Sequence, residues 1–346
     1  TLRGRMGWRN LEDGFEVTTN KLAFQLYNGF ELRPTSVLLS LGNLDENRFG
    51  RGEVRANFLE LADFGTLMEY LPLERQLKQQ FADYAPRGRI ENLHAQWESA
   101  AGQRLQYQLN ARFEQLALHR VGNLPGFSGL TGEIAGNDSG GTLSVNAHKF
   151  RLEAPQFLPE ELAFESITAQ SSWQSDDDEL EIKLSNLSVV NDDLAGSAYG
   201  SYRTAANSAG KVDATLRLTR ASLPRVQRYL PLSILGQDTR SWMKKGLLAG
   251  QSADASVRVK GDLNDFPFVD GSKGIFKVHV RARGVDVDYA EGWPRIENAT
   301  ADFLLQGKQM EVSVPSAMTA GARLQKVGVT LPDMLSDKLL LQVRGE

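Results

Sequence analysis

Alternation of apolar and polar residues is the feature that most limits how this 346-residue chain can fold. In KVDATLRL, residues 211–218, every second residue is apolar, and the residues between are charged or carry a hydroxyl group. Successive side chains of a β-strand point to opposite faces, so this period of two predicts a strand with one apolar and one wet face. The pattern recurs, with Gly, Asn and Asp turn signals between the segments, at 22–26, 143–147, 180–189, 253–259, 276–282 and 301–314. The chain is therefore predicted to be mainly β.

The apolar faces of such strands can be used in two ways. They can fill the core of a closed sandwich or barrel. They can instead line an open groove, which needs a ligand or a partner because soluble proteins rarely expose large apolar patches. Periodicity alone does not distinguish the two.

Helical signals are confined to two stretches. In 61–82, Leu73, Leu77 and Phe81 are spaced to lie on one helix face. In 222–249, Ser222 is expected to cap a first helix that ends before a proline, and Asp238 a second one that ends at a glycine. A turn is expected at 158–162. A few short helices are therefore predicted among many strands.

Composition excludes several classes of site. The chain has no cysteine, which rules out disulfides, thiolate zinc sites and a cysteine nucleophile. The net charge of −4 and the absence of a Lys/Arg block argue against a nucleic-acid partner. No apolar run reaches the 18 residues that a membrane-spanning helix needs. Because the chain starts at Thr1 without a signal peptide, it is expected to be an internal piece of a longer protein.

The motifs that suggest chemistry have simpler explanations. NDSGG at 137–141 is similar to the surroundings of a serine-protease nucleophile, but it lies between two alternating segments and predicts a hairpin turn. The four histidines are isolated and show no metal-binding spacing. The acidic run 176–181 lacks the spacing of a calcium loop. No catalytic residue, metal site or cofactor is predicted, and the chain is expected not to be an enzyme.

Two parts of the chain resemble each other. YLPL occurs at 70–73 and at 229–232, and each copy accompanies helical signals. Aligning Trp8 with Trp173 brings the alternating segment from Phe15 onto that from Leu180 without a gap. We therefore predict about two copies of a unit near 160 residues, with a first groove repeat at 1–121 and a second at 122–346 in one continuous structure.

The order of many weak motifs resembles one known family. The stretches that carry the resemblance include GFSGLTGEIAGNDSGG, ASLPRVQRYLPLSILGQDTRSWMKKG and GIFKVHVRARGVDVDYAEGWPRIENATADF. With these, residues 122–346 resemble the AsmA-like family of Gram-negative bacteria, most closely its YhdP-type members. Residues 1–121 look like the preceding part of the same pattern. The resemblance covers nearly the whole chain, although no single motif in it is catalytic.

The resemblance implies a fold and a role. The fold would be an elongated, curved, antiparallel-type sheet that forms a repeating β-groove, with a few short helices at its edges. The role would be non-enzymatic transfer of phospholipid across the periplasm, in support of the outer-membrane barrier. The full-length protein would be anchored in the inner membrane by an N-terminal helix and would have envelope proteins as further partners.

One face of each predicted strand would line this groove and contact acyl chains. The candidates are Leu22, Phe24, Leu143, Val145, Leu180, Ile182, Leu216, Leu218, Val257, Val259, Val278, Val280, Phe303, Leu305, Val312 and Val314. Two alternatives stay open: a periplasmic scaffold that binds other envelope proteins, and a carbohydrate-active or hydrolytic β-protein.

Overall fold

The computed structural model describes residues 2–25, 31–45, 48–68, 75–99, 104–176, 179–205, 207–232, 236–269, 271–336 and 340–345. Its strands, numbered β1 to β19, form one antiparallel sheet that is not closed, and its helices are few and short. This confirms the predicted mainly β fold and excludes a closed sandwich or barrel. Within the described ranges, no helix has the length and apolar character that crossing a membrane requires.

The chain divides into two units. Unit 1 consists of residues 1–153 and 170–176, and unit 2 of residues 154–169 and 177–346. The strand β10 (Leu162–Asp176) therefore contributes to both.

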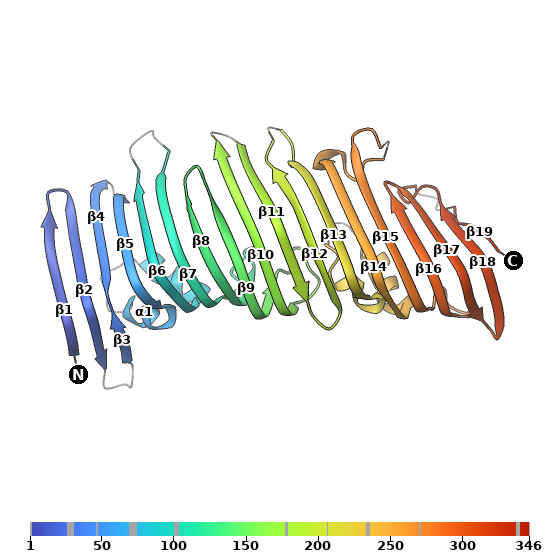
Figure 1. The fold of residues 1–346 in the computed structure, drawn as a ribbon, viewed down its shortest axis with the longest axis horizontal. Helices are drawn as coiled ribbons and strands as arrows, with labels where there is room; N and C mark the ends of the chain where they lie inside the picture. The colour runs from blue at the N-terminus through green and yellow to red at the C-terminus, as the bar shows by residue number, and fades with distance from the viewer. Residues whose placement is uncertain are drawn as a thin grey trace. The chain divides into compact units, whose positions relative to one another are not determined.

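Unit 1 is built from strands that lie beside one another in sequence order (Figure 1). Each pairs antiparallel with the next, except that β3 and β4 both pair with β2. Its elements are β1 (Leu2–Leu11), β2 (Gly14–Gln25), β3 (Glu31–Thr35), β4 (Val37–Asp45), β5 (Arg48–Glu60), α1 (Leu61–Met68), α2 (Arg75–Tyr84), β6 (Arg87–Glu98), β7 (Gln106–Leu118), β8 (Gly126–Asn137) and β9 (Gly140–Glu153).

Unit 2 follows the same rule of sequence-order, antiparallel pairing. Its elements after β10 are β11 (Glu179–Val190), β12 (Leu194–Arg203), β13 (Lys211–Ser222), η1 (Leu223–Arg228), α3 (Gln237–Gly246), β14 (Leu247–Asp262), η2 (Leu263–Asp265), β15 (Gly274–Val287), β16 (Ile296–Gln306), β17 (Gln309–Thr319), β18 (Ala322–Leu331) and β19 (Gln342–Arg344).

The helical segments differ in detail from the prediction. Ser222 does precede the first one of unit 2, but this segment is a 3₁₀-helix, and the serine side chain makes no capping hydrogen bond. A 3₁₀-helix suits a segment of only six residues because it is stable only in short pieces. The next helix begins after Gly236, so Asp238 is not its cap but lies in its first turn. A carboxylate there complements the positive end of the helix dipole.

The first YLPL copy contains Tyr70, Leu71 and Leu73, and these residues lie outside the described ranges. The helices α1 and α2 flank it. Of the predicted helical face, Leu77 and Phe81 lie in α2, and Leu73 lies outside the described ranges.

Several strands of unit 1 are bent by bulges. Lys21, Asn92 and Gln115 have positive φ angles of 48°, 51° and 51°, and the strand register shifts beside each of them. A bulge leaves one residue unpaired, bends its strand and increases the local twist. The strands therefore depart from flat, regular pairing.

One cluster of buried residues lies where a helical segment covers the sheet. In unit 2 the buried cluster consists of Ala282, Val285, Ala299 and Ala317, and Leu223 of η1 packs against it. No large side chain among the described residues is fully buried. The apolar strand faces are thus only partly covered by the described residues.

Candidate functional site

Unit 2 has one continuous apolar face. Residues directly opposite each other in antiparallel strands share a face, and Leu216, Val257, Val278 and Leu305 form such a row across β13 to β16. The neighbouring row contains Leu218, Ala255, Val280, Phe303 and Val312. All candidates from Leu180 to Val314 lie on this face, which we call the apolar face of unit 2.

Unit 1 has a corresponding apolar face. Val17, Leu39, Val54, Ala95 and Leu109 stand opposite one another from β2 to β7. The row of five residues was missed from the sequence, although alternation in GEVRANF and RLQYQL could have indicated two of its strands.

The four candidates of unit 1 lie in two places. Leu143 is opposite Ile134 between β8 and β9, and Val145 is two residues further along the same face. Leu22 and Phe24 lie beyond the bulge at Lys21, opposite Thr35 and Leu2 respectively. Of these four candidates, only Leu143 and Val145 therefore lie in the regular part of the sheet.

The apolar faces are open to solvent over much of their area. Ile182 is 40% exposed, and Leu216, Val257 and Val278 are each only partly buried. The chain exposes 22184 Å² in total. Two compact proteins, each with half the mass of this chain, would together expose about 17,000 Å². Apolar side chains that would form a core in a compact domain are therefore accessible.

A polar network holds the 3₁₀-helix η1 of unit 2 against the turn between β11 and β12. The Tyr229 hydroxyl accepts a hydrogen bond from Asn191 Nδ2 at 2.8 Å and donates one to Asp193 Oδ2 at 2.9 Å. Arg228 contacts the same carboxylate at 2.5 Å and Glu160 at 2.7 Å. Burial raises the pKa of Tyr229 to about 12, so the hydroxyl is protonated at neutral pH. We call Asn191, Asp193, Arg228 and Tyr229 the Tyr229 network.

The network places the second YLPL copy against the turn between β11 and β12. A second side chain, Arg240 of α3, donates to the carbonyl oxygens of Gln227, Leu230 and Pro231 at 2.6, 3.1 and 3.1 Å. These acceptors lie at the end of the 3₁₀-helix, where carbonyl groups lack helical partners. The helical segments η1 and α3 are therefore joined by hydrogen bonds from Arg240.

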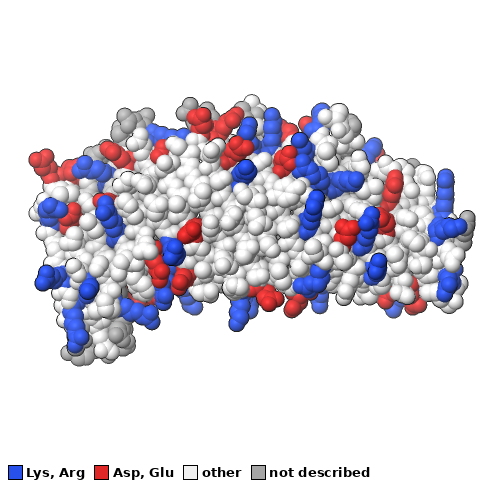
Figure 2. Space-filling model, viewed as in Figure 1, with Lys and Arg blue, Asp and Glu red and all other residues white. Residues whose placement is uncertain are grey.

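The opposite face of each unit is polar. Its cross-strand pairs have opposite charges, such as Arg203 with Glu181 at 3.1 Å and Arg258 with Asp213 at 2.5 Å. The hydrogen bond from Arg258 is the main cause that lowers the pKa of Asp213, and Lys260 acts in the same direction. Figure 2 shows both signs interspersed rather than one large patch. This pattern gives a hydrated face without attraction for a polyanion.

Aromatic rings lie flat over glycines on the apolar side of unit 1. A Cβ atom on Gly52 would lie 2.2 Å from the Trp97 ring, and one on Gly136 would lie 2.6 Å from the Trp173 ring. Only glycine permits this close approach. Trp173, the residue aligned with Trp8 in the sequence, thus has a packing role in the sheet.

The structure explains the sequence motifs that were rejected as catalytic or metal sites. Ser139 lies in the hairpin turn between β8 and β9, and its backbone N–H donates to Asn137 Oδ1 at 2.9 Å. The hairpin prediction is confirmed. In the described ranges, no three His, Asp or Glu side chains are grouped so that they could hold a metal ion.

Comparison with known proteins shows the family of the chain. A model of the family described as YhdP protein matches residues 1–346. The chain belongs to the YhdP family. It is 22% identical over 307 residues to "Intermembrane phospholipid transporter YhdP" of Escherichia coli (strain K12), a match that covers 87% of this chain. No solved structure matches it.

The family membership confirms the resemblance found in the sequence. The match covers 24% of the length of the E. coli relative. The chain thus corresponds to about a quarter of that transporter, and the activity of the whole protein is not assigned to it by the match alone.

Proposed function

We propose that this chain is a non-enzymatic segment of a phospholipid-conducting protein, and that acyl chains lie on the apolar face of each unit. The observation that carries the proposal is the exposure of continuous apolar rows such as Leu216–Val257–Val278–Leu305. An open apolar face of this extent needs a ligand. The description of the E. coli relative as an intermembrane phospholipid transporter supports phospholipid as that ligand.

The physical benefit of such a face is large. Moving a diacyl lipid through water exposes about 30 methylene groups, which costs about 24 kcal/mol at about 0.8 kcal/mol per group. An apolar surface that stays in contact with the chains removes most of this barrier. Neither a nucleophile nor a metal is needed, because no covalent bond changes.

The proposal places the chain in the periplasm. A protein that moves phospholipid between two membranes must present its apolar face in the space between them. We infer that the longer protein supplies the membrane contacts, with an N-terminal anchor in the inner membrane as the family resemblance implies.

Site-specific photocrosslinking tests the proposal. A benzophenone amino acid at Val257 should crosslink to phospholipid, whereas one at Ser256, the adjacent residue on the polar face, should not. Ile182 and Lys183 form a second matched pair. Mass spectrometry of lipid extracted from the purified chain identifies the bound species.

Two results would reject the proposal. One is equal lipid crosslinking from both members of each pair. The other is crosslinking from Val257 and Ile182 to protein alone, which would favour a scaffold whose apolar face is covered by a partner.

A further inference from the structure

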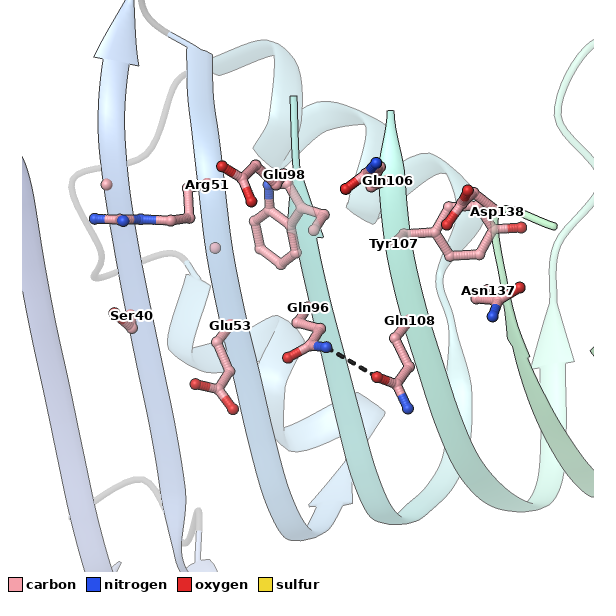
Figure 3. Close-up of a pocket in the computed structure, with 13 residues that line it drawn as sticks. Ser40, Arg51, Glu53, Gln96, Glu98, Gln106, Tyr107, Gln108, Asn137 and Asp138 are labelled. Carbon is pink, nitrogen blue, oxygen red and sulfur yellow. Dashed lines mark hydrogen bonds between the residues drawn. The ribbon is translucent and has the colours of Figure 1, made fainter. Parts of the chain in front are cut away.

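The polar face of unit 1 contains a hollow of about 570 Å³. Residues of β4 to β8 line it (Figure 3). Among them Trp97 and Tyr107 alternate with the polar residues, so their side chains belong to the opposite face. The hollow is separate from the apolar rows and has no part in the proposed lipid transport.

The floor of the hollow is a single row of polar side chains. Ser40, Glu53, Gln96, Gln108 and Asn137 stand directly opposite one another across the five strands. Neighbouring strands are about 4.8 Å apart, so the row is about 19 Å long. It runs across the strands and has the length of an extended oligomer rather than of a small metabolite.

A second polar row lies next to the first. Arg51 is opposite Glu98, which is opposite Gln106. Arg51 is held by Asp13 at 3.1 Å. Glu98 and Gln106 make no side-chain hydrogen bond to any residue in the described ranges, so their polar groups are available to a ligand.

The hollow differs from the rest of the polar face in its chemistry. Opposite charges neutralise each other elsewhere on the polar faces, as in Arg258 with Asp213, and within the hollow Glu53 is likewise paired with Arg55 and His94. The row differs in its amides: Gln96 donates to Gln108 Oε1 at 2.9 Å, which leaves one amide hydrogen of Gln96, both amide hydrogens of Gln108 and further oxygen lone pairs unused. Amides that both donate and accept match hydroxyl and acetamido groups, which also do both.

Other ligand classes fit less well. A polyanion would meet Glu53, Glu98 and Asp138 without a free cation to bind it. A lipid chain would find no apolar floor. A peptide strand binds a sheet through unpaired backbone groups at an edge, whereas β5 to β8 are paired on both sides.

We propose that this hollow binds a neutral glycan chain that lies across β4 to β8. The amide and carboxylate side chains of the row hydrogen-bond to its hydroxyl or acetamido groups. A protein with this arrangement holds an apolar ligand on one face and a hydroxyl-rich polymer on the other.

Calorimetric titration of the whole chain with defined neutral tetrasaccharides tests the proposal. The probes are the β-1,4-linked tetramers of N-acetylglucosamine and of glucose, and the α-1,4-linked tetramer of glucose. At least one should bind, and the double variant Gln96→Ala/Gln108→Ala should weaken it by about tenfold, which corresponds to about 1.4 kcal/mol. Both glutamines are on the sheet surface, so the variant should keep the wild-type unfolding temperature.

Gln325→Ala, an exposed glutamine on β18 in unit 2, is the matched control and should bind like the wild type. Absence of binding by all three tetrasaccharides would overturn the proposal, as would equal binding by the wild type and the double variant. Binding of an extended ten-residue peptide, lost in the same double variant while no glycan binds, would assign the hollow to a peptide instead. Lipid extracted from the double variant should equal that from the wild type, so this result stays distinguishable from failure of the lipid proposal.

Discussion

Val257 and Val280 share the apolar face of unit 2 but differ in what covers them. Val280 packs against the buried cluster that contains Ala282 and Val285, under the 3₁₀-helix. Val257 lies outside that cluster, although both valines are partly buried. The same substitution should therefore have different effects at the two positions.

Val280→Asp should lower the free energy of unfolding by about 2–4 kcal/mol, because it places an unpaired charge in a covered apolar site. Val257→Asp should cost about 1 kcal/mol and should reduce co-purified phospholipid strongly. Thermal denaturation and lipid mass spectrometry measure the two effects. Equal destabilisation by both substitutions, with no lipid lost from the Val257 variant, would contradict the open apolar face.

Gly52→Ala should destabilise unit 1 by about 1–3 kcal/mol, because the new methyl group would overlap the Trp97 ring. The double variant Gly52→Ala/Trp97→Ala should show a coupling energy, since removal of the ring removes the overlap. Gly328→Ala is the control, as a methyl group there meets no atom within 4 Å. Urea denaturation of these three variants and of Trp97→Ala alone gives the values, and additive effects at Gly52 and Trp97 would argue against the ring-on-glycine contact.

For single residues, the sequence predicted which face of a strand they lie on but not which residues of other strands they contact. Alternation assigned Val257 and Val278 to one side of their strands, and the register confirms that they are opposite each other. The polar row in the hollow had no signal, because Ser40, Gln96 and Asn137 are far apart in the chain and become neighbours only through strand pairing.

The helical element of unit 2 depends on the Tyr229 network. Tyr229→Phe removes one donated and one accepted hydrogen bond and should lower the free energy of unfolding by about 1–2 kcal/mol at neutral pH. Differential scanning calorimetry measures this loss. An unchanged stability would mean that Arg228 and Arg240 hold the element without the tyrosine.

The same network predicts a dependence on alkaline pH. The pKa of Tyr229 rises to about 12 in the folded chain from an ordinary value near 10 in the unfolded chain. Between these values the unfolded tyrosine loses its proton while the folded one keeps it, so stability falls as pH rises through this window. The wild type should therefore lose more stability than Tyr229→Phe between pH 10 and 12. Parallel losses in both proteins would contradict the assignment.

Element types were easier to predict than their details. Long alternating segments such as 247–262 became strands because the period of two fits only one backbone geometry. The short helical segments were less predictable, since the choice between 3₁₀ and α and the cap at Gly236 depend on the sheet they pack on. The bulge at Lys21 gave no signal because lysine is not a usual residue at positive φ, whereas asparagine is enriched there, so Asn92 could have indicated its bulge.

The order of elements supports the proposed internal repeat. Two series of elements have the same order when β3 and β4 are counted as one interrupted strand. Each series has four strands, then helical segments, then four strands: β1 to β9 with α1 and α2, and β10 to β17 with η1 and α3. The second series starts with β10, which carries Trp173, the residue aligned with Trp8. We propose that the two units descend from one repeated module, and the boundary at 121/122 stays a prediction.

The surface of the whole chain predicts an unusual response to denaturant. An unfolded chain of this size exposes about 55,000 Å², and a compact native protein of the same mass about 14,000 Å². This chain already exposes 22184 Å² when folded. Unfolding therefore uncovers about one fifth less surface than it would for a compact protein. Because the urea m-value scales with that surface, the summed m-value of all transitions should be lower by about the same fraction.

The measurement is urea denaturation of delipidated, monomeric protein, with monomer confirmed by analytical ultracentrifugation. Addition of phospholipid below its aggregation limit should raise both the midpoint and the m-value, because lipid covers the apolar rows of the folded state only and is released on unfolding. A summed m-value equal to that of a compact 346-residue protein, unchanged by phospholipid, would mean that the apolar faces are already covered in solution. That outcome would remove the physical reason for a lipid on these faces.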